Sequence, residues 1–177
     1  MSALRNDLHT VQDILDLPDG VRMELIDGML YDMASPTFSH QNDAGSLFRQ
    51  LSDYFESKGA RCKAMIAPFA VYLNDDDLTY VEPDVLVVCD PDKLKEDGCH
   101  GAPDLCVEVV SESSRKRDYL IKLMKYGNAG VREYWIVDRD HNRITVYHLE
   151  QEDFVEYTFD DEIASGLFEG LRVTLRE

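Results

Sequence analysis

Two acidic residues stand in apolar segments where a buried strand should carry none. Glu108 lies in the middle of the run PDLCVEVV, and Asp84 follows Pro83 at the start of the run DVLVVCD. An ionised carboxylate in a strand that is buried on both faces is costly unless it is paired or binds a metal. Carboxylate oxygens are the natural ligands of hard divalent cations. If the two strands are neighbours, Asp84 and Glu108 can converge on one cation.

A structural interpretation of the same acids stays open. Asp84 can be a turn residue, and Glu108 can form a salt bridge with an Arg or Lys. Alternation along the strand places Glu108 on the face opposite to Val107 and Val109. Asp104 also follows a proline, at the first position of its strand, so it is better explained as a turn acid.

The helix predicted after Glu108 supplies a candidate lysine. Lys122 lies at the margin of the apolar face of this helix, so its side chain can reach inward. Lys125 lies nearly opposite the centre of that face, so it should be in solvent. The alternative for Lys122 is a surface residue whose stem covers apolar surface while its ammonium stays in water. The apolar face is expected to consist of Tyr119, Leu120, Leu123, Met124 and Gly127.

The charge distribution limits nucleic-acid binding. The net charge is −17, from 35 acidic residues against 18 Lys and Arg, so an overall basic surface for phosphate backbones is absent. Residues 150–162 carry seven acids and no base, whereas residues 111–132 form the one basic segment. Within that segment Arg115, Lys116 and Arg117 are candidate phosphate contacts. Such a run is also typical of a solvated helix face.

Length and composition indicate one globular domain. The chain has 177 residues, of which 44% are hydrophobic and 30% charged, and this composition excludes disordered and fibrous proteins. No apolar run approaches the ~20 residues that a membrane-spanning helix needs. The first 17 residues lack the apolar core of a signal peptide, so a cytoplasmic location is expected.

The four cysteines do not suggest a metal centre. No CxxC pair occurs among Cys62, Cys89, Cys99 and Cys106, and this absence disfavours a zinc site. Cys89 and Cys106 lie inside apolar runs and are expected to act as small buried hydrophobic residues.

The hydrophobic pattern predicts a mixed fold. A short helix begins at Thr10, and Asp27-Gly28 is the expected turn of a hairpin over residues 23–33. The element order is α-β-β-α-β-β-β-α-β-β-β-β, which indicates a single α/β (α+β) domain with one central mixed sheet flanked by helices. The remaining elements are a helix at 38–58, two to three strands within 61–73, strands at 83–90 and 103–110, a helix at 115–128, and strands at 132–138, 142–149, 153–159 and 171–175.

Four blocks of the chain resemble a bacterial nuclease family. The sequence is similar to the Uma-type restriction endonucleases, which are assigned to the PD-(D/E)XK nuclease superfamily and its restriction-endonuclease-like fold. The similarity extends from Thr10 to Leu175. It implies one nuclease-like domain over residues 1–177, with an N-terminal helix and hairpin at 10–33, a core at 37–140 and C-terminal strands at 141–175. The matching blocks are residues 23–41, 81–90, 103–138 and 166–175.

The resemblance assigns roles to individual residues. Asp84 matches the metal-binding aspartate of the superfamily and Glu108 its second acid. The superfamily signature has a lysine two residues after that acid, where this sequence has Val110. In the Uma-type family the lysine is displaced into the next helix, a position that Lys122 occupies. Two further matches are Glu24 in the first hairpin, a candidate catalytic residue, and His40, a possible site residue.

The resemblance implies metal-dependent DNA hydrolysis. Asp84, Glu108 and the Val109 carbonyl would hold Mg²⁺, for which Mn²⁺ can substitute, and Lys122 would orient or activate the attacking water. Glu24 would hold a second ion or pair with a base. A homodimer is expected because cutting both strands of a duplex benefits from two sites related by a two-fold axis. A nuclease-fold binding or regulatory module and an enzyme on another phosphodiester remain alternatives.

Overall fold

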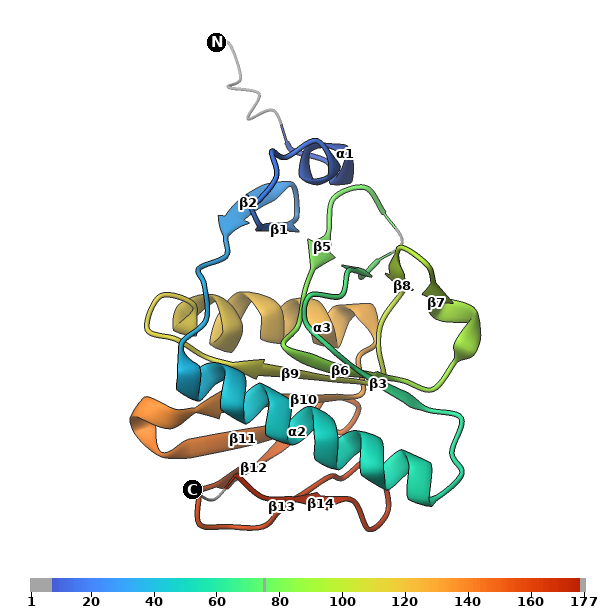
Figure 1. Cartoon of the computed structure of the whole chain (residues 1–177), viewed down its shortest axis with the longest axis vertical. Coiled ribbons are helices and arrows are strands. Elements are labelled where there is room, and N and C mark those ends of the chain that lie inside the picture. Colours follow the sequence, from blue (N-terminus) through green and yellow to red (C-terminus); the bar gives the residue numbers. More distant parts are fainter. Residues whose placement is uncertain (1–7, 75, 176–177) are drawn as a thin grey trace.

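A six-stranded mixed sheet forms the centre of the protein. The computed structural model describes residues 8–74 and 76–175. The strand order is β12-β11-β10-β9-β6-β3, and only the β9–β10 pair is parallel. Figure 1 shows this sheet below the N-terminal part of the chain. Its strands are β3 (Lys63–Ile66), β6 (Val85–Val88), β9 (Leu105–Val109), β10 (Glu133–Asp138), β11 (Arg143–His148) and β12 (Asp153–Tyr157).

Helices cover both faces of the central sheet. The 20-residue α2 (Phe38–Ser57) packs Leu47 and Leu51 against the face that carries Val107. The opposite face, with Cys106, is covered by a continuous helix made of η2 (Arg117–Lys122), a π-helical segment, and α3 (Leu123–Ala129) (Figure 1). The inner strands β6, β9 and β10 are therefore buried on both sides, as the apolar runs of β6 and β9 predict, whereas the edge strands β3 and β12 are not. No helix in residues 8–74 and 76–175 is long and apolar enough to cross a membrane.

A second six-stranded sheet lies on the α3 side. Its order is β2-β1-β5-β4-β8-β7, and its residues Val71 and Val81 share a core with Leu86 and Cys106 of the central sheet. The predicted hairpin forms its edge, with Asp27 and Gly28 at positive φ (51° and 74°), as a two-residue turn of type I′ requires. The strands are β1 (Met23–Ile26), β2 (Met29–Asp32), β4 (Val71–Tyr72), β5 (Tyr80–Val81), β7 (Leu94–Lys95) and β8 (Gly98–His100).

The predicted fold class is confirmed, with more sheets than expected. The chain forms one α+β domain with mixed sheets, but the expectation of one sheet was incomplete. The strands β4, β5 and β7 have two residues each, too few to produce an alternating pattern. The remaining elements are α1 (Val11–Leu15), η1 (Pro91–Lys93), η3 (Arg139–His141) and a ribbon of β13 (Ile163–Ala164) with β14 (Arg172–Val173).

The expectation for Cys89 was wrong. Cys89 forms a disulfide with Cys62, whereas Cys106 and Cys99 are free and buried. The antiparallel pairing of β3 with β6 places Lys63 opposite Val88, so the cysteines just beyond them face each other. A pairing between residues 27 positions apart depends on strand register, which cysteine spacing does not reveal.

Candidate active site

One cleft gathers most of the predicted site residues. Its volume is about 670 Å³, and it lies between the start of α2, the β1–β2 hairpin and the end of β9. Both acids of the sequence prediction line it, together with the candidate lysine. The lining residues used below are Glu24, His40, Asp84, Glu108, Val109, Arg117, Asp118 and Lys122.

Asp84 and Glu108 come from adjacent strands, as predicted. Val85 of β6 pairs with Val107 of β9, so Asp84 stands across from Glu108 one position beyond the last paired residues. Asp84 Oδ2 accepts a hydrogen bond from the Val109 N–H at 2.8 Å. This hydrogen bond holds the Asp84 carboxylate at the end of β9.

His40, in the first turn of α2, also contacts Asp84. Its Nε2 lies 3.2 Å from Asp84 Oδ2. Burial disfavours the imidazolium, but the Asp84 carboxylate and the Val109 backbone outweigh it, and the pKa of His40 is raised. The structure therefore places this imidazole against two of the predicted metal ligands, Asp84 and Val109.

Glu108 is a buried acid bonded to two groups of the following helix. Its Oε1 accepts hydrogen bonds from Lys122 Nζ at 2.7 Å and from the Tyr126 hydroxyl at 2.8 Å. Burial raises the pKa of Glu108 well above its ordinary value; Lys122 acts to lower it, and nearby carboxylates, including Asp118 and Asp84, raise it further. The pKa of Lys122 is also raised, because the surrounding carboxylates outweigh the cost of burying the ammonium.

Lys122 is the last residue of the π-helical segment and shares an inward face with the residues four before and four after it. Residues four apart lie on one face of an α-helix, and the wider turn of a π-helix keeps them together as well. Asp118, Lys122 and Tyr126 are spaced by four and are 2%, 3% and 0% exposed. The predicted direction of Lys122 is right. The predicted apolar face is right for Tyr119 and Leu123, which pack against the core, and wrong for Leu120 and Met124, which are 55% and 64% exposed.

Two residues of this face, Asp118 and Tyr126, were not among the predicted site residues. Both contact the predicted site, because Asp118 Oδ1 lies 3.9 Å from Lys122 Nζ and Tyr126 bonds Glu108. The available signal was the recurrence of polar side chains at every fourth position. Residues at i, i+4 and i+8 share one face of an α-helix, so the sequence itself carries this pattern.

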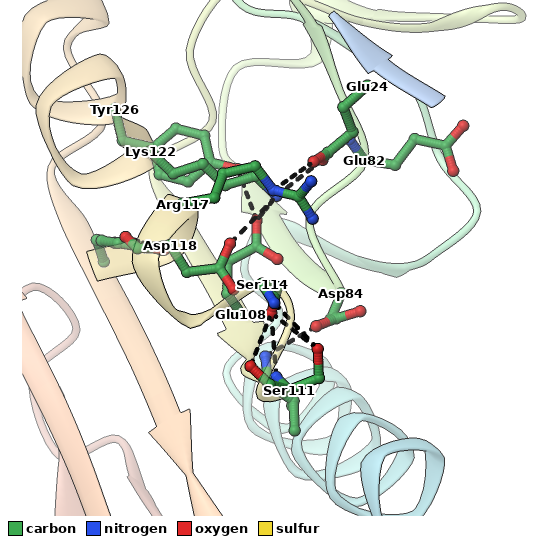
Figure 2. Close-up of polar contacts among 12 residues, drawn as sticks. Glu24, Glu82, Asp84, Glu108, Ser111, Ser114, Arg117, Asp118, Lys122 and Tyr126 are labelled. Carbon is green, nitrogen blue, oxygen red and sulfur yellow. Dashed lines mark hydrogen bonds and ion pairs between the residues drawn. The ribbon is translucent and has the colours of Figure 1, made fainter. Parts of the chain in front are cut away.

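Glu24 reaches the same lysine from the hairpin. Its Oε1 lies 2.7 Å from Lys122 Nζ and accepts the Glu82 N–H at 3.0 Å. Arg117 Nε is 3.6 Å from Glu24 Oε2, and the Arg117 guanidinium lies over the Tyr31 ring. Figure 2 shows Glu24 and Glu108 approaching Lys122 from different elements.

The three bases predicted to contact DNA are dispersed. Arg117 lines the cleft, whereas Arg115 and Lys116 are not among its lining residues. Arg115 donates hydrogen bonds to Asp138 at 3.1 and 3.2 Å and to Asp140 at 2.9 Å. Lys116 is exposed. Whether Arg115 and Lys116 contact phosphate stays a prediction.

The carboxylates of Asp84 and Glu108 and the carbonyl of Val109 suit a hard divalent cation. Asp84 uses only Oδ2 and Glu108 only Oε1 in hydrogen bonds within the described ranges, so each carboxylate keeps one oxygen for a ligand. Two carboxylates and a backbone carbonyl suit Mg²⁺, which retains several waters in proteins. Residues 8–74 and 76–175 contain no group of three or more His, Cys, Asp or Glu side chains placed to hold a metal ion. Protein donors alone would therefore not complete the coordination shell.

Comparison with known proteins gives a family and a fold. A solved structure from Anabaena variabilis ATCC 29413, described as "a putative nuclease belonging to DUF820", matches with a TM-score of 0.75 and 15% identity over 94% of each chain. At that identity the likeness shows the fold alone. No curated protein matches the chain. The Uma2 family model, described as "Putative restriction endonuclease", matches residues 11–176. Because this match spans nearly the whole sequence, the chain belongs to the Uma2 family.

Proposed function

We propose that this protein is a divalent-metal-dependent endonuclease that hydrolyses DNA phosphodiester bonds. The observation that carries the proposal is the position of Lys122 Nζ, 2.7 Å from Glu108, in the cleft that Asp84 and Val109 also line. An acid pair at the ends of adjacent strands with a buried lysine beside it is the donor set that metal-assisted phosphodiester hydrolysis requires. Family membership supports the same class of reaction.

The proposed ligands are Asp84, Glu108 and the Val109 carbonyl, with Mg²⁺ as the ion and Mn²⁺ as a substitute. A bound ion would polarise the phosphate and lower the pKa of a coordinated water. Lys122 donates a hydrogen bond that orients the attacking water and offsets the negative charge that develops on the phosphate. His40 and the Val109 N–H hold Asp84 in place through its Oδ2.

The charge of the cleft makes cation binding a precondition for DNA binding. Nine acids and four Lys or Arg line it in the described ranges, and each of these four bases is already paired with an acid. A phosphate is therefore repelled until a divalent cation enters. DNA affinity should be weak without metal, rise with it, and depend on salt with a shallow slope that corresponds to about 3 to 5 phosphates. Arg117, with Arg115 and Lys116 outside the cleft, would supply these contacts.

Cleavage of plasmid and single-stranded DNA in Mg²⁺ or Mn²⁺ tests the proposal. Glu108→Gln should reduce the rate by at least about 100-fold, and Lys122→Ala should abolish cleavage. Glu112→Gln is the matched control, because Glu112 is an exposed acid on the same cleft and should leave the rate unchanged. Equal cleavage by wild type and Glu108→Gln would contradict the proposal.

A nuclease-fold binding module is the second candidate, and the net charge of −17 favours it. Fluorescence anisotropy with labelled duplex separates the two, with Ca²⁺ supporting binding without turnover. Metal-strengthened binding with cleavage in Mg²⁺ supports the enzyme. Equal affinity with and without the cation would place the phosphate elsewhere and favour the module.

The expected assembly and location are also proposals. A homodimer would use the exposed edge strand β12, where Phe154 is 53% and Val155 39% exposed, and light scattering at high protein concentration tests it. A monomer there would count against the dimer. The expected cytoplasmic location has one observation against it, the Cys62–Cys89 disulfide, because such bonds are rare in the cytosol.

A further inference from the structure

Lys122 lies among three buried carboxylates that outnumber it. Its Nζ is 2.7 Å from Glu24 Oε1, 2.7 Å from Glu108 Oε1 and 3.9 Å from Asp118 Oδ1. The four side chains are at most 6% exposed. Figure 2 shows them converging from the hairpin, the end of β9 and the π-helical segment. One ammonium therefore faces three acids that the fold brings from distant parts of the chain.

Two oxygens of this cluster have no donor. Glu24 Oε2 and Asp118 Oδ1 are buried and accept no hydrogen bond from the described residues. Arg117 Nε lies 3.6 Å from Glu24 Oε2, which is too long for a hydrogen bond. Buried acceptors are normally satisfied by protein, water or a cation. The three acids outnumber the two bases beside them, Lys122 and Arg117, so the cluster has more acceptor capacity and more negative charge than its bases offset.

We propose that the Lys122 ammonium occupies the place of a second divalent cation, so that the site binds one metal ion per chain. This inference rests on the proposed function, because it concerns the same site. In two-metal sites the ions lie about 3.5–4 Å apart and are bridged by shared ligands. Glu108 is shared in this way, since it bonds Lys122 through Oε1 and keeps Oε2 for the ion beside Asp84. Glu24 then pairs with a base and does not ligate metal.

Replacing Lys122 should allow a second divalent cation to bind in its place. Without its positive charge, Glu24, Glu108 and Asp118 are three buried carboxylates beside one base, Arg117, whose Nε lies 3.6 Å from Glu24 Oε2. The cluster then carries an excess of negative charge that a divalent cation would offset. Lys122→Met keeps the length and apolar stem of the side chain. Neutralising Asp118 in the same background removes one ligand and part of the charge, so it should weaken the second site again.

Counting bound Mn²⁺ by calorimetry and electron paramagnetic resonance tests this inference. We expect one ion per chain in the wild type, two in Lys122→Met, and one in Lys122→Met/Asp118→Asn. Lys125→Met is the matched control and should stay at one, because Lys125 lies outside the cleft and pairs with Asp27. Two ions in the wild type, or equal numbers of ions in the wild type and in Lys122→Met, would overturn the inference.

Folding is measured on the same samples. Lys122→Met should be destabilised in chelator, and Mn²⁺ should raise its melting temperature more than it raises that of the wild type, because binding the folded state stabilises it. Failure of Lys122→Met to fold even in Mn²⁺ would also overturn the inference. No ion in the wild type with one in Lys122→Met would contradict the proposed metal-dependent function while supporting the surrogate role of Lys122.

Discussion

Two buried glutamates on adjacent strands have opposite surroundings. Glu133 of β10 faces the α2 side of the central sheet, and Glu108 of β9 faces the α3 side. Glu133 is fully buried and surrounded by donors. Its oxygens accept hydrogen bonds from Trp135 Nε1 (2.8 Å), Ser165 Oγ (2.8 Å), Gly166 N (2.7 Å) and Leu167 N (2.9 Å), with His148 Nδ1 at 3.2 Å.

Glu108 has two donors and several acids around it. Lys122 and Tyr126 bond one of its oxygens, and burial, together with neighbouring carboxylates, raises its pKa. Glu133 fixes the loop at residues 165–167 to the sheet, a structural role. The comparison indicates that burial alone does not mark a functional acid. Glu108 differs in that it lines the cleft of about 670 Å³ among other carboxylates.

The largest expected effect that separates the two acids is on stability at Glu133. Glu133→Gln replaces one acceptor with an NH₂ group that must face an existing donor, so the free energy of unfolding should fall by about 3 kcal/mol. Urea denaturation at pH 7 measures it, with the exposed Glu150→Gln as control. A loss below about 0.5 kcal/mol would mean that the loop does not depend on the carboxylate.

A third buried acid, Asp138, extends the comparison to an ion pair. Burial acts to raise its pKa, but hydrogen bonds from Arg115 and His141 outweigh it, so the pKa is lowered. A carboxylate with a lowered folded pKa adds stability above its unfolded pKa, and that stability is lost as the pH falls through the folded value.

Asp138→Asn should therefore cost about 2 kcal/mol at pH 7. The difference from wild type should shrink as the pH drops below about 4, where the unfolded aspartate takes up its proton. Denaturation across pH 3 to 7 checks both points. A difference that is constant over this range would show that the charge of Asp138 contributes nothing.

Glu108→Gln should raise the free energy of unfolding, whereas Glu133→Gln should lower it. Because the folded pKa of Glu108 is raised, its contribution to stability is full below the unfolded pKa and is lost as the pH rises toward the folded value. The amide keeps an acceptor for Lys122 and Tyr126 and removes one like charge. In chelator at pH 7 the variant should gain about 1 kcal/mol, and the gain should vanish near pH 4. Destabilisation at pH 7 would show that Lys122 needs all three carboxylates.

The sequence predicted Asp84 and Glu108 as candidate site acids but did not distinguish Glu108 from the structural acid Glu133. The runs that contain Glu108 and Glu133 look alike, since each is an acid in an apolar strand. What separates them is the partners, which come from residues 118–126 in one case and 165–167 in the other. Such contacts depend on tertiary packing, so local periodicity does not contain them.

The same limit applies to the rest of the fold. The hairpin at Asp27-Gly28 and the helix starting near Phe38 were predictable because turn chemistry and helical periodicity are local signals. The π-helical segment, the Cys62–Cys89 bond and the second sheet were not, because each depends on packing or register between distant segments.

Lys125 gives the smallest expected effect and isolates the role of Lys122. The two lysines are three residues apart on one helix. Lys122 is buried in the acid cluster, whereas Lys125, which was expected to be in solvent, is only 22% exposed and pairs with Asp27, a turn residue that is 60% exposed. A solvent-screened pair of this kind is worth little, so Lys125→Ala should change stability by less than about 0.5 kcal/mol and leave cleavage unchanged. Urea denaturation and plasmid cleavage check it beside Lys122→Ala. Loss of cleavage in Lys125→Ala with full activity in Lys122→Ala would mean that the catalytic lysine lies on the outer side of the helix, against the hairpin turn.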